Sequence, residues 1–212
     1  MIKHQLFYTT FLFLIFTFSI SAQVQKSLKL YAIVGGQVNK FNSQFNTNLP
    51  SQISSFSLGA GSGYYFNRLN IGTEFYFSNG TNSNSNFKVD YSGMNTSLFI
   101  GYNILKNKKL LLEPALGFSF LNNKSIISNK TSFQNQYYSN NQLGLTPSLS
   151  ISKINSSGIF YGLKVGYNFS FNANSYWKDE NVEANSMLND NVGSFFIQFT
   201  TGSFLNLSKK KS

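Results

Sequence analysis

The sequence predicts an all-β fold, namely one eight-stranded antiparallel up-and-down transmembrane β-barrel. Three observations support this prediction. Beyond residue 28, large apolar residues alternate with small or polar residues at a period of two, which is the period of a strand. The small row holds Gly, Ser, Asn and Thr, with few charged residues. The connections between the expected strands are alternately long and short.

Eight segments carry this alternation, and each is expected to form one strand. The clearest covers 159–171, where Ile159, Tyr161 and Leu163 share one face and Gly162 and Lys164 share the other. The expected strands are residues 28–39, 55–66, 69–78, 94–103, 110–120, 143–151, 159–171 and 192–207.

Two prolines fall on the bulky rows of these strands, at Pro114 and Pro147. Proline has no backbone N–H to donate to a neighbouring strand. We therefore expect a bulge or a local break in strand pairing at each of these positions.

The composition of the two faces distinguishes a membrane barrel from a soluble one. A soluble barrel shows its polar face to water and carries Lys, Glu and Thr there. In this chain only 11% of the residues are charged. The small residues of the second row suit the narrow lumen of an eight-stranded barrel, so the bulky row is expected to contact lipid.

The lengths of the connections predict the orientation of the barrel. Outer-membrane barrels have long connections outside the cell and short turns in the periplasm. The long connections are 40–51, 79–88, 121–139 and 172–191, and the short ones are 67–68, 105–109 and 153–157. This arrangement puts ten basic residues on the periplasmic side, and they are Lys26, Lys29, Arg68, Lys106, Lys108, Lys109, Lys153, Lys209, Lys210 and Lys211.

The N-terminal segment has the order of a secretory signal peptide. Lys3 and His4 precede an apolar run that ends at Phe18, and small residues follow up to Ala22. We expect residues 1–22 to be a signal peptide and 23–212 to form the barrel domain in the outer membrane. An uncleaved anchor helix is the alternative for the first segment.

The residue types that are missing restrict the chemistry. The chain has no Cys, and its one His, His4, lies in the expected signal peptide. Thiol catalysis, zinc fingers, zinc-hydrolase sites, haem sites and most familiar catalytic triads are thereby excluded from the mature chain. We expect no catalytic residue, no metal and no cofactor. Nucleic acid is not an expected partner, because no stripe of Lys and Arg is interleaved with aromatic residues.

Three ionisable residues are placed in the barrel interior by the alternation. They are Glu74, Glu113 and Lys164, and all lie on strands that run in the same direction. Charges that face a narrow interior are costly unless they are paired, so we expect Lys164 to pair with Glu74, Glu113 or both. A structural plug is the main interpretation, and a proton or ion path is the alternative.

Four aromatic residues in the long connections are candidate surface contacts. They are Tyr137, Tyr138, Tyr176 and Trp177. Exposed aromatic side chains often anchor a binding partner. The alternative, favoured for Tyr176 and Trp177, is a place in the aromatic girdle at the membrane interface.

A motif on the seventh expected strand carries a family resemblance. GLKVGYNFS at 162–170 is similar to the G-x-K-x-G-x-N-x-S strand of the outer membrane protein beta-barrel domain family, which includes small OmpA/OmpX-like and PorT-like barrels. Family members usually carry this motif on the first strand, and they commonly end on an aromatic residue, whereas this chain ends FLNLSKKKS. The resemblance covers residues 28–207 and implies an eight-stranded barrel.

Together, these observations predict a non-enzymatic outer-membrane β-barrel with a structural or surface-interaction role in a Gram-negative envelope. One alternative is a PorT-like subunit of a secretion or envelope machine. Another is a narrow pore or a carrier of hydrophobic ligands. The expected partners are outer-membrane lipid and either a surface ligand or proteins of an envelope machine.

Overall fold

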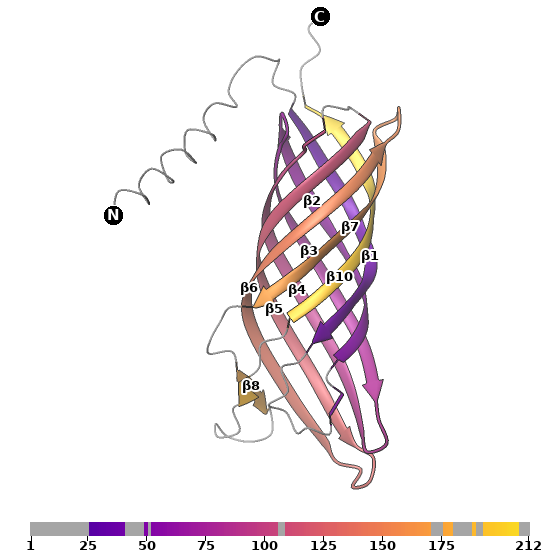
Figure 1. Cartoon of the computed structure of the whole chain (residues 1–212), viewed down its shortest axis with the longest axis vertical. Helices are drawn as coiled ribbons and strands as arrows, with labels where there is room; N and C mark the ends of the chain where they lie inside the picture. The colour runs from indigo at the N-terminus through magenta and orange to yellow at the C-terminus, as the bar shows by residue number, and fades with distance from the viewer. Residues whose placement is uncertain are drawn as a thin grey trace, which may run out of the picture.

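In the computed structural model, eight long strands wind into one antiparallel barrel (Figure 1). The structure describes residues 26–40, 49–50, 52–105, 109–170, 176–179, 188–189 and 193–207. The barrel strands are β1 (Lys26–Lys40), β2 (Gln52–Phe66), β3 (Leu69–Ser83), β4 (Phe87–Tyr102), β5 (Leu110–Asn129), β6 (Asn135–Ile154), β7 (Ile159–Ser170) and β10 (Gly193–Asn206). The short strands β8 (Tyr176–Asp179) and β9 (Leu188–Asn189) extend the sheet beside β6. The expected signal peptide lies outside the described residues.

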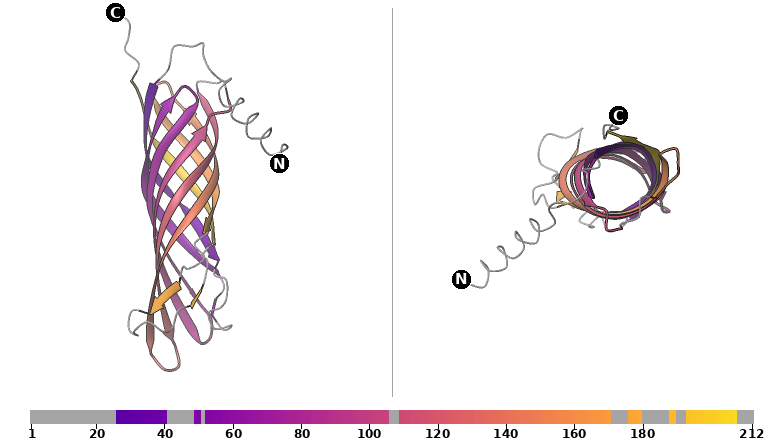
Figure 2. Two further views of the ribbon diagram at one scale, coloured as in Figure 1. Left: turned by 90° about the vertical axis from the view of Figure 1, so that its left-hand side faces the viewer. Right: turned by 90° about the horizontal axis from the view of Figure 1, so that it is seen from above.

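Pairing between β1 and β10 closes the barrel, and the ring is visible from above in Figure 2. Each of the other barrel strands pairs with its neighbours in the chain. When paired residues are followed once around the ring from Ser27, the path returns to β1 at Gln37, ten residues further on. This stagger tilts the strands, as Figure 1 shows, and it confirms the predicted closed, eight-stranded, up-and-down barrel.

The expected assignment of the two faces is confirmed. Leu58 on β2 is 55% exposed, whereas its neighbour Ser57 is fully buried in the lumen. The same alternation runs along the other barrel strands, so large apolar side chains cover the outside. No helix in the described ranges is long and apolar enough to cross a bilayer.

Two of the predicted long connections are mostly strand, which corrects the sequence analysis. β3 and β4 stay paired up to Ser83 and Lys88, and β5 and β6 stay paired up to Ser128 and Asn135. Segments 79–88 and 121–139 are rich in Asn and Ser, and this composition suggested loops. Backbone pairing does not depend on apolar side chains, so the polar segments continue the sheet as two tall hairpins. Most of 40–51 and 172–191 lies outside the described residues.

We call the two ends of the barrel the hairpin end, where these two hairpins protrude, and the turn end, where the short connections lie (Figure 1). The predicted short connection at 67–68 is confirmed, and Asn67 has the positive φ of 59° that a tight turn requires. The short connection before β7 is also confirmed, with Asn155 accepting backbone hydrogen bonds from Ser157 and Ile159.

The expected breaks at the prolines are confirmed, without bulges. Pairing between β6 and β7 is interrupted at Thr146 and Pro147, and the register is the same on both sides of the gap. Pro114 lies one residue beyond the last pair of β4 and β5, which joins Gly101 and Ala115. Each proline lacks the N–H donor on one side, and the pairing is missing on that side only. On the other side, both prolines lie within the continuous pairing of β5 and β6.

Candidate functional site

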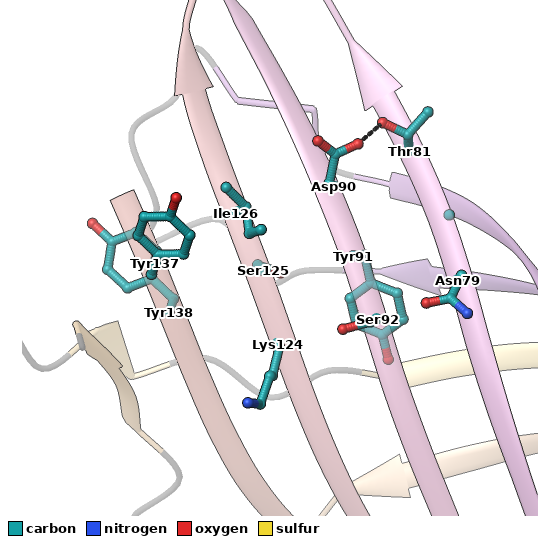
Figure 3. A pocket seen from close by; sticks show the side chains of 11 residues that line it. Asn79, Thr81, Asp90, Tyr91, Ser92, Lys124, Ser125, Ile126, Tyr137 and Tyr138 are labelled. Atoms are coloured by element: carbon teal, nitrogen blue, oxygen red, sulfur yellow. Dashed lines mark hydrogen bonds between the residues drawn. The ribbon is translucent and has the colours of Figure 1, made fainter. Parts of the chain in front are cut away.

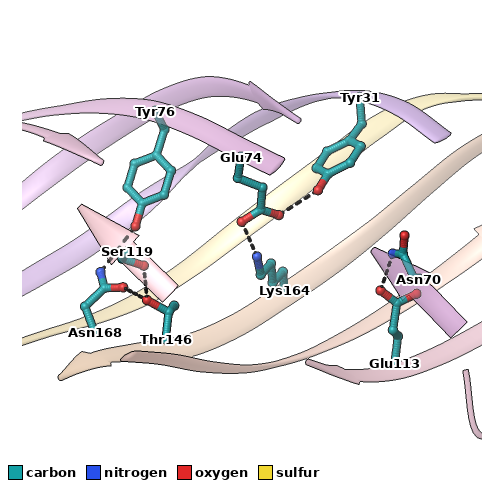
Figure 4. Close-up of polar contacts among 9 residues, drawn as sticks. All are labelled: Tyr31, Asn70, Glu74, Tyr76, Glu113, Ser119, Thr146, Lys164 and Asn168. Carbon is teal, nitrogen blue, oxygen red and sulfur yellow. Dashed lines mark hydrogen bonds and ion pairs between the residues drawn. The ribbon is translucent and has the colours of Figure 1, made fainter. Parts of the chain in front are cut away.

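The barrel interior holds an ion pair between Glu74 on β3 and Lys164 on β7 (Figure 4). Their side chains are only 5% and 9% exposed. The Tyr31 hydroxyl donates a hydrogen bond of 2.7 Å to the other carboxylate oxygen of Glu74. The alternation of β3 and β7 turns both charges inward, where the low dielectric makes pairing necessary. The structure therefore brings together two of the three expected interior charges.

Glu113 on β5 lies in a separate group and does not contact Lys164. Asn70 donates to one of its carboxylate oxygens at 2.6 Å, and the Tyr65 hydroxyl donates to the other. Asn70 is on β3 and Tyr65 is on β2, which lie two and three places from β5 in the sheet (Figure 4 shows Asn70). Glu113 is thus held by neutral donors rather than by an ion pair.

Lys29 is a fourth interior charge that the sequence analysis placed on the periplasmic side. Its side chain is 5% exposed, and its ammonium group lies 4.9 Å and 4.7 Å from the ring centroids of Tyr31 and Phe160. Odd-numbered residues of β1 face the lumen, so the alternation that identified the other three also applied to Lys29. Two cations and two anions therefore balance in the described part of the lumen.

A layer of neutral polar side chains crosses the lumen on the hairpin side of the ion pair (Figure 4). Asn168 contacts three side chains: Thr146 donates to it at 2.7 Å, and it donates to Tyr76 at 3.2 Å and to Ser194 at 2.8 Å. These contacts join β3, β6, β7 and β10 through side chains as well as through the sheet. The layer fills the middle of the lumen with hydrogen-bonded groups.

Apolar clusters lie beyond the polar layer toward both ends. The cluster at the hairpin end consists of Ile53, Val89, Tyr91, Ile127 and Tyr138, all under 9% exposed. The cluster nearer the turn end consists of Tyr31, Ile33 and Phe160, with Ile154 and Phe204 packed against it. Side chains thus fill the lumen at both ends and in the middle, as expected for eight strands.

The structure places the expected aromatic surface contacts in different environments. Tyr137 faces outward and is 38% exposed. Tyr138 is no surface contact, because the next residue of a strand points to the opposite face and its ring is buried in the hairpin-end cluster. Tyr176 and Trp177 belong to β8, and their side chains lie outside the described part of the chain.

The tip of the β5–β6 hairpin presents Phe133, which the sequence analysis did not select. Its side chain is 89% exposed, and its φ is 55°, a rare value for an aromatic residue. Asn129 orders the tip by accepting hydrogen bonds from the backbone of Thr131 and Ser132. Lys130 joins this tip to the neighbouring hairpin by donating to the carbonyl of Asn84. Phe133 therefore projects into solvent from a turn that hydrogen bonds of Asn129 and Lys130 stabilise.

A pocket lies at the hairpin end, across β3 to β6 (Figure 3). Its lining combines outward side chains with the lumen-facing residues Tyr91, Ser125 and Tyr138. Its outward side chains form two rows of paired residues across the sheet. The first row is Asn79, Ser92 and Lys124, and the second is Thr81, Asp90, Ile126 and Tyr137.

Asp90 is the one acidic residue of this pocket, and its charge is already compensated. Lys88 forms an ion pair with it at 2.8 Å, and the Thr81 hydroxyl donates to it. Partial burial disfavours the charged form of Asp90, but the hydrogen bonds from Lys88 and Thr81 and the charge of Lys88 outweigh this effect and lower its pKa. Within the described residues, no group of three or more His, Cys, Asp or Glu could hold a metal ion.

Comparisons with known proteins identify the fold class. No protein-family model matches the chain, and no curated protein matches its sequence. Among solved structures, it is similar to Neisserial surface protein A (15% identity, TM-score 0.50, covering 81% of this chain and 95% of that one). It is also similar to Ail, the attachment invasion locus protein of Yersinia pestis (14% identity, TM-score 0.50, covering 86% of this chain and 100% of that one). A third similar structure is a major outer membrane protein from Thermus thermophilus (11% identity, TM-score 0.52, covering 83% of this chain and 99% of that one).

These similarities, at identities of 15% and below, concern the fold alone. The chain has the fold of the small eight-stranded outer-membrane barrels, in agreement with the class that the sequence predicted.

Proposed function

We propose that this protein is a non-enzymatic barrel of the outer membrane that acts through its hairpin end, by contact with a partner outside the cell. The observation that supports this most is the filled lumen: an apolar cluster lies toward each end and a hydrogen-bonded polar layer lies between them. A filled lumen leaves the ends and the outer face as the surfaces on which the protein can act.

Phe133 is the proposed centre of the contact. Exposed aromatic residues on a well-ordered support are typical anchors of protein interfaces. Phe133 extends from a turn that Asn129 orders and that Lys130 ties to the β3–β4 hairpin, so little ordering entropy remains to be lost on binding. The expected interior plug of Glu74, Glu113 and Lys164 serves here as the structural element that keeps this support rigid.

A PorT-like subunit of an envelope machine is the second candidate. It is favoured by the GLKVGYNFS motif at 162–170 and by the basic residues of the turn end, among which Lys26, Arg68, Lys109 and Lys153 lie in the described part. In that case the partner would be a protein on the periplasmic side. The narrow pore and the carrier of hydrophobic ligands receive no support from the filled lumen.

Orientation is tested first, and the absence of native Cys makes the test direct. Ser132→Cys is at the hairpin tip, and Ser157→Cys is the matched variant in an exposed turn at the other end. A membrane-impermeant maleimide applied to intact cells should label the first variant and not the second. The reverse pattern, or labelling of neither until the cells are opened, would contradict the proposal.

The partner is tested by photo-crosslinking in living cells. A photoreactive amino acid replaces Phe133 in one variant and Ser157 in another, and a third carries it at Leu98, which is 64% exposed within the lipid-facing belt. Adducts with proteins or glycans from position 133 alone would support the surface role. Protein adducts from position 157 alone would favour the machine subunit. Adducts from neither position would contradict both.

A further inference from the structure

The pocket at the hairpin end lies next to the outward apolar surface of the barrel, on the side nearer the hairpin tips. Toward the hairpin tips, one row of outward residues is Phe77, Met94 and Asn122, and the pocket begins with the next row. Two residues along a tilted strand correspond to about 5 Å of height. The pocket is therefore at the level where the headgroups of lipids that pack on Phe77 and Met94 must lie.

From this position we propose that the pocket binds the phosphorylated sugar headgroup of an outer-leaflet glycolipid. The proposal uses the predicted membrane location and orientation, but it assigns a ligand that is separate from the surface partner of Phe133. Lys124 is assigned to the phosphate, the polar side chains of the first row to the sugar hydroxyls, and Tyr137 to the apolar face of the sugar ring.

The charges of the pocket favour an anionic group over a cation. Asp90 is engaged by Lys88 and Thr81, so its negative charge is compensated within the protein. Lys124 is exposed and has no ion-pair partner among the residues whose side chains the structure describes. An ammonium group at the height of lipid headgroups attracts a phosphate, and such charge-assisted hydrogen bonds are the stronger ones.

The neutral side chains of the pocket favour a sugar next to that phosphate. The side chains of Asn79 and Ser92 have no hydrogen-bond partners within the described part of the chain, and both can donate to and accept from hydroxyl groups. Ile126 and Tyr137, which are neighbours in the second row, add an apolar and an aromatic surface (Figure 3). A headgroup with a phosphate alone would leave most of these groups without a contact.

The four strands that carry these groups are paired continuously through both rows of the pocket. Thr81 pairs with Asp90, Asp90 with Ile126, and Ile126 with Tyr137. The sheet therefore fixes the spacing of the groups before any ligand binds, and preorganisation of this kind reduces the cost of binding.

The test compares three lipids bound to the purified full-length barrel in detergent micelles, with occupancy measured by native mass spectrometry. Bisphosphorylated lipid A carries both sugar and phosphate, phosphatidylglycerol carries a phosphate without a sugar, and monogalactosyl diacylglycerol carries a sugar without a phosphate. Lipid A should bind at least tenfold more tightly than either of the others. Equal binding of lipid A and phosphatidylglycerol would overturn the proposal.

Matched variants locate the site. Lys124→Gln should weaken binding of lipid A about tenfold, as expected for loss of one charge-assisted contact, and Tyr137→Ala should weaken it several-fold. The controls make the same changes in exposed residues of the turn end, as Lys153→Gln and Tyr161→Ala, and should leave the affinity unchanged. Equal losses at the two ends would show diffuse attraction and overturn the proposed site. The crosslinking at Phe133 does not depend on this result.

Discussion

The ammonium group of Lys164 contacts a carboxylate oxygen of Glu74 across the barrel lumen, although the two residues are 90 positions apart in the sequence. The pair joins β3 to β7, two strands that do not neighbour each other in the sheet. Tyr31 from β1 completes the group with a hydrogen bond to Glu74. Lys164, Glu74 and Tyr31 thus link three strands of the wall through the interior.

Removal of one partner should be costly. We expect Lys164→Met to lower the free energy of unfolding by about 3 to 5 kcal/mol, because it leaves the carboxylate of Glu74 buried without its counter-charge. Urea unfolding of the barrel in lipid vesicles measures the change. Adding Glu74→Gln to this variant should recover part of the loss. Lys153→Met at the exposed turn end is the control and should change stability by less than about 0.5 kcal/mol. Equal stability of Lys164→Met and the wild type would refute a stabilising role for the pair.

Gly61 is predicted to be essential for the position of Tyr31. The two residues are cross-strand partners, and a Cβ on Gly61 would lie 2.4 Å from the Tyr31 ring. Gly61→Ala should therefore displace the ring from Glu74 and destabilise the barrel by about 1 to 3 kcal/mol. Gly36→Ala is the matched control, since its Cβ would face outward with no atom nearer than 3.8 Å. The temperature at which the unboiled band on an SDS gel converts to the unfolded band compares the two variants. Equal conversion temperatures would show that the close approach is unimportant.

The filled lumen predicts little ion conduction. Water and ions need a continuous path, whereas the hairpin-end cluster around Ile53 and the layer around Asn168 occupy the lumen at two levels. We expect the wild-type protein in a planar bilayer to give no large steady current. Large steady currents that persist when the protein is further purified would disprove the plug and would revive the pore hypothesis.

The pKa of Asp90 provides a pH-dependent prediction outside the membrane. Partial burial alone would raise this pKa, but Lys88 and Thr81 favour the charged form more strongly and lower it. The contacts of Asp90 are thus fully present above its ordinary pKa in an unfolded chain, and they are lost as the pH falls through the lowered value. Carboxyl ¹³C chemical shifts recorded during a pH titration measure it. Lys88→Met should move the pKa of Asp90 up toward its ordinary value, and an unchanged pKa would argue against the ion pair.

The sequence contained enough to predict most of the wall. Strand alternation identified eight strands and assigned inward and outward faces, so Glu74, Glu113 and Lys164 were expected inside from the pattern alone. The same rule applied to Lys29, but its place three residues inside β1 was taken for a periplasmic edge. Because segments 79–88 and 121–139 are rich in Asn and Ser, the parts of the two tall hairpins nearest their tips were likewise taken for loops. Local composition reports solvent exposure, whereas strand length depends on whether a neighbouring strand is available for pairing.

What the sequence determined by itself is the two-residue period and the contrast between a bulky row and a small row. For a chain that crosses the membrane with strands this implies a barrel, because among sheets only a closed one satisfies every backbone group in lipid. The tertiary structure decided which interior groups meet: Lys164 pairs with Glu74 and not with Glu113, Tyr138 turns into the lumen, and Phe133 projects from the tip. These outcomes depend on the ten-residue stagger of the closed ring, which sets the relative heights of distant strands and is the sum of eight registers that no single segment encodes.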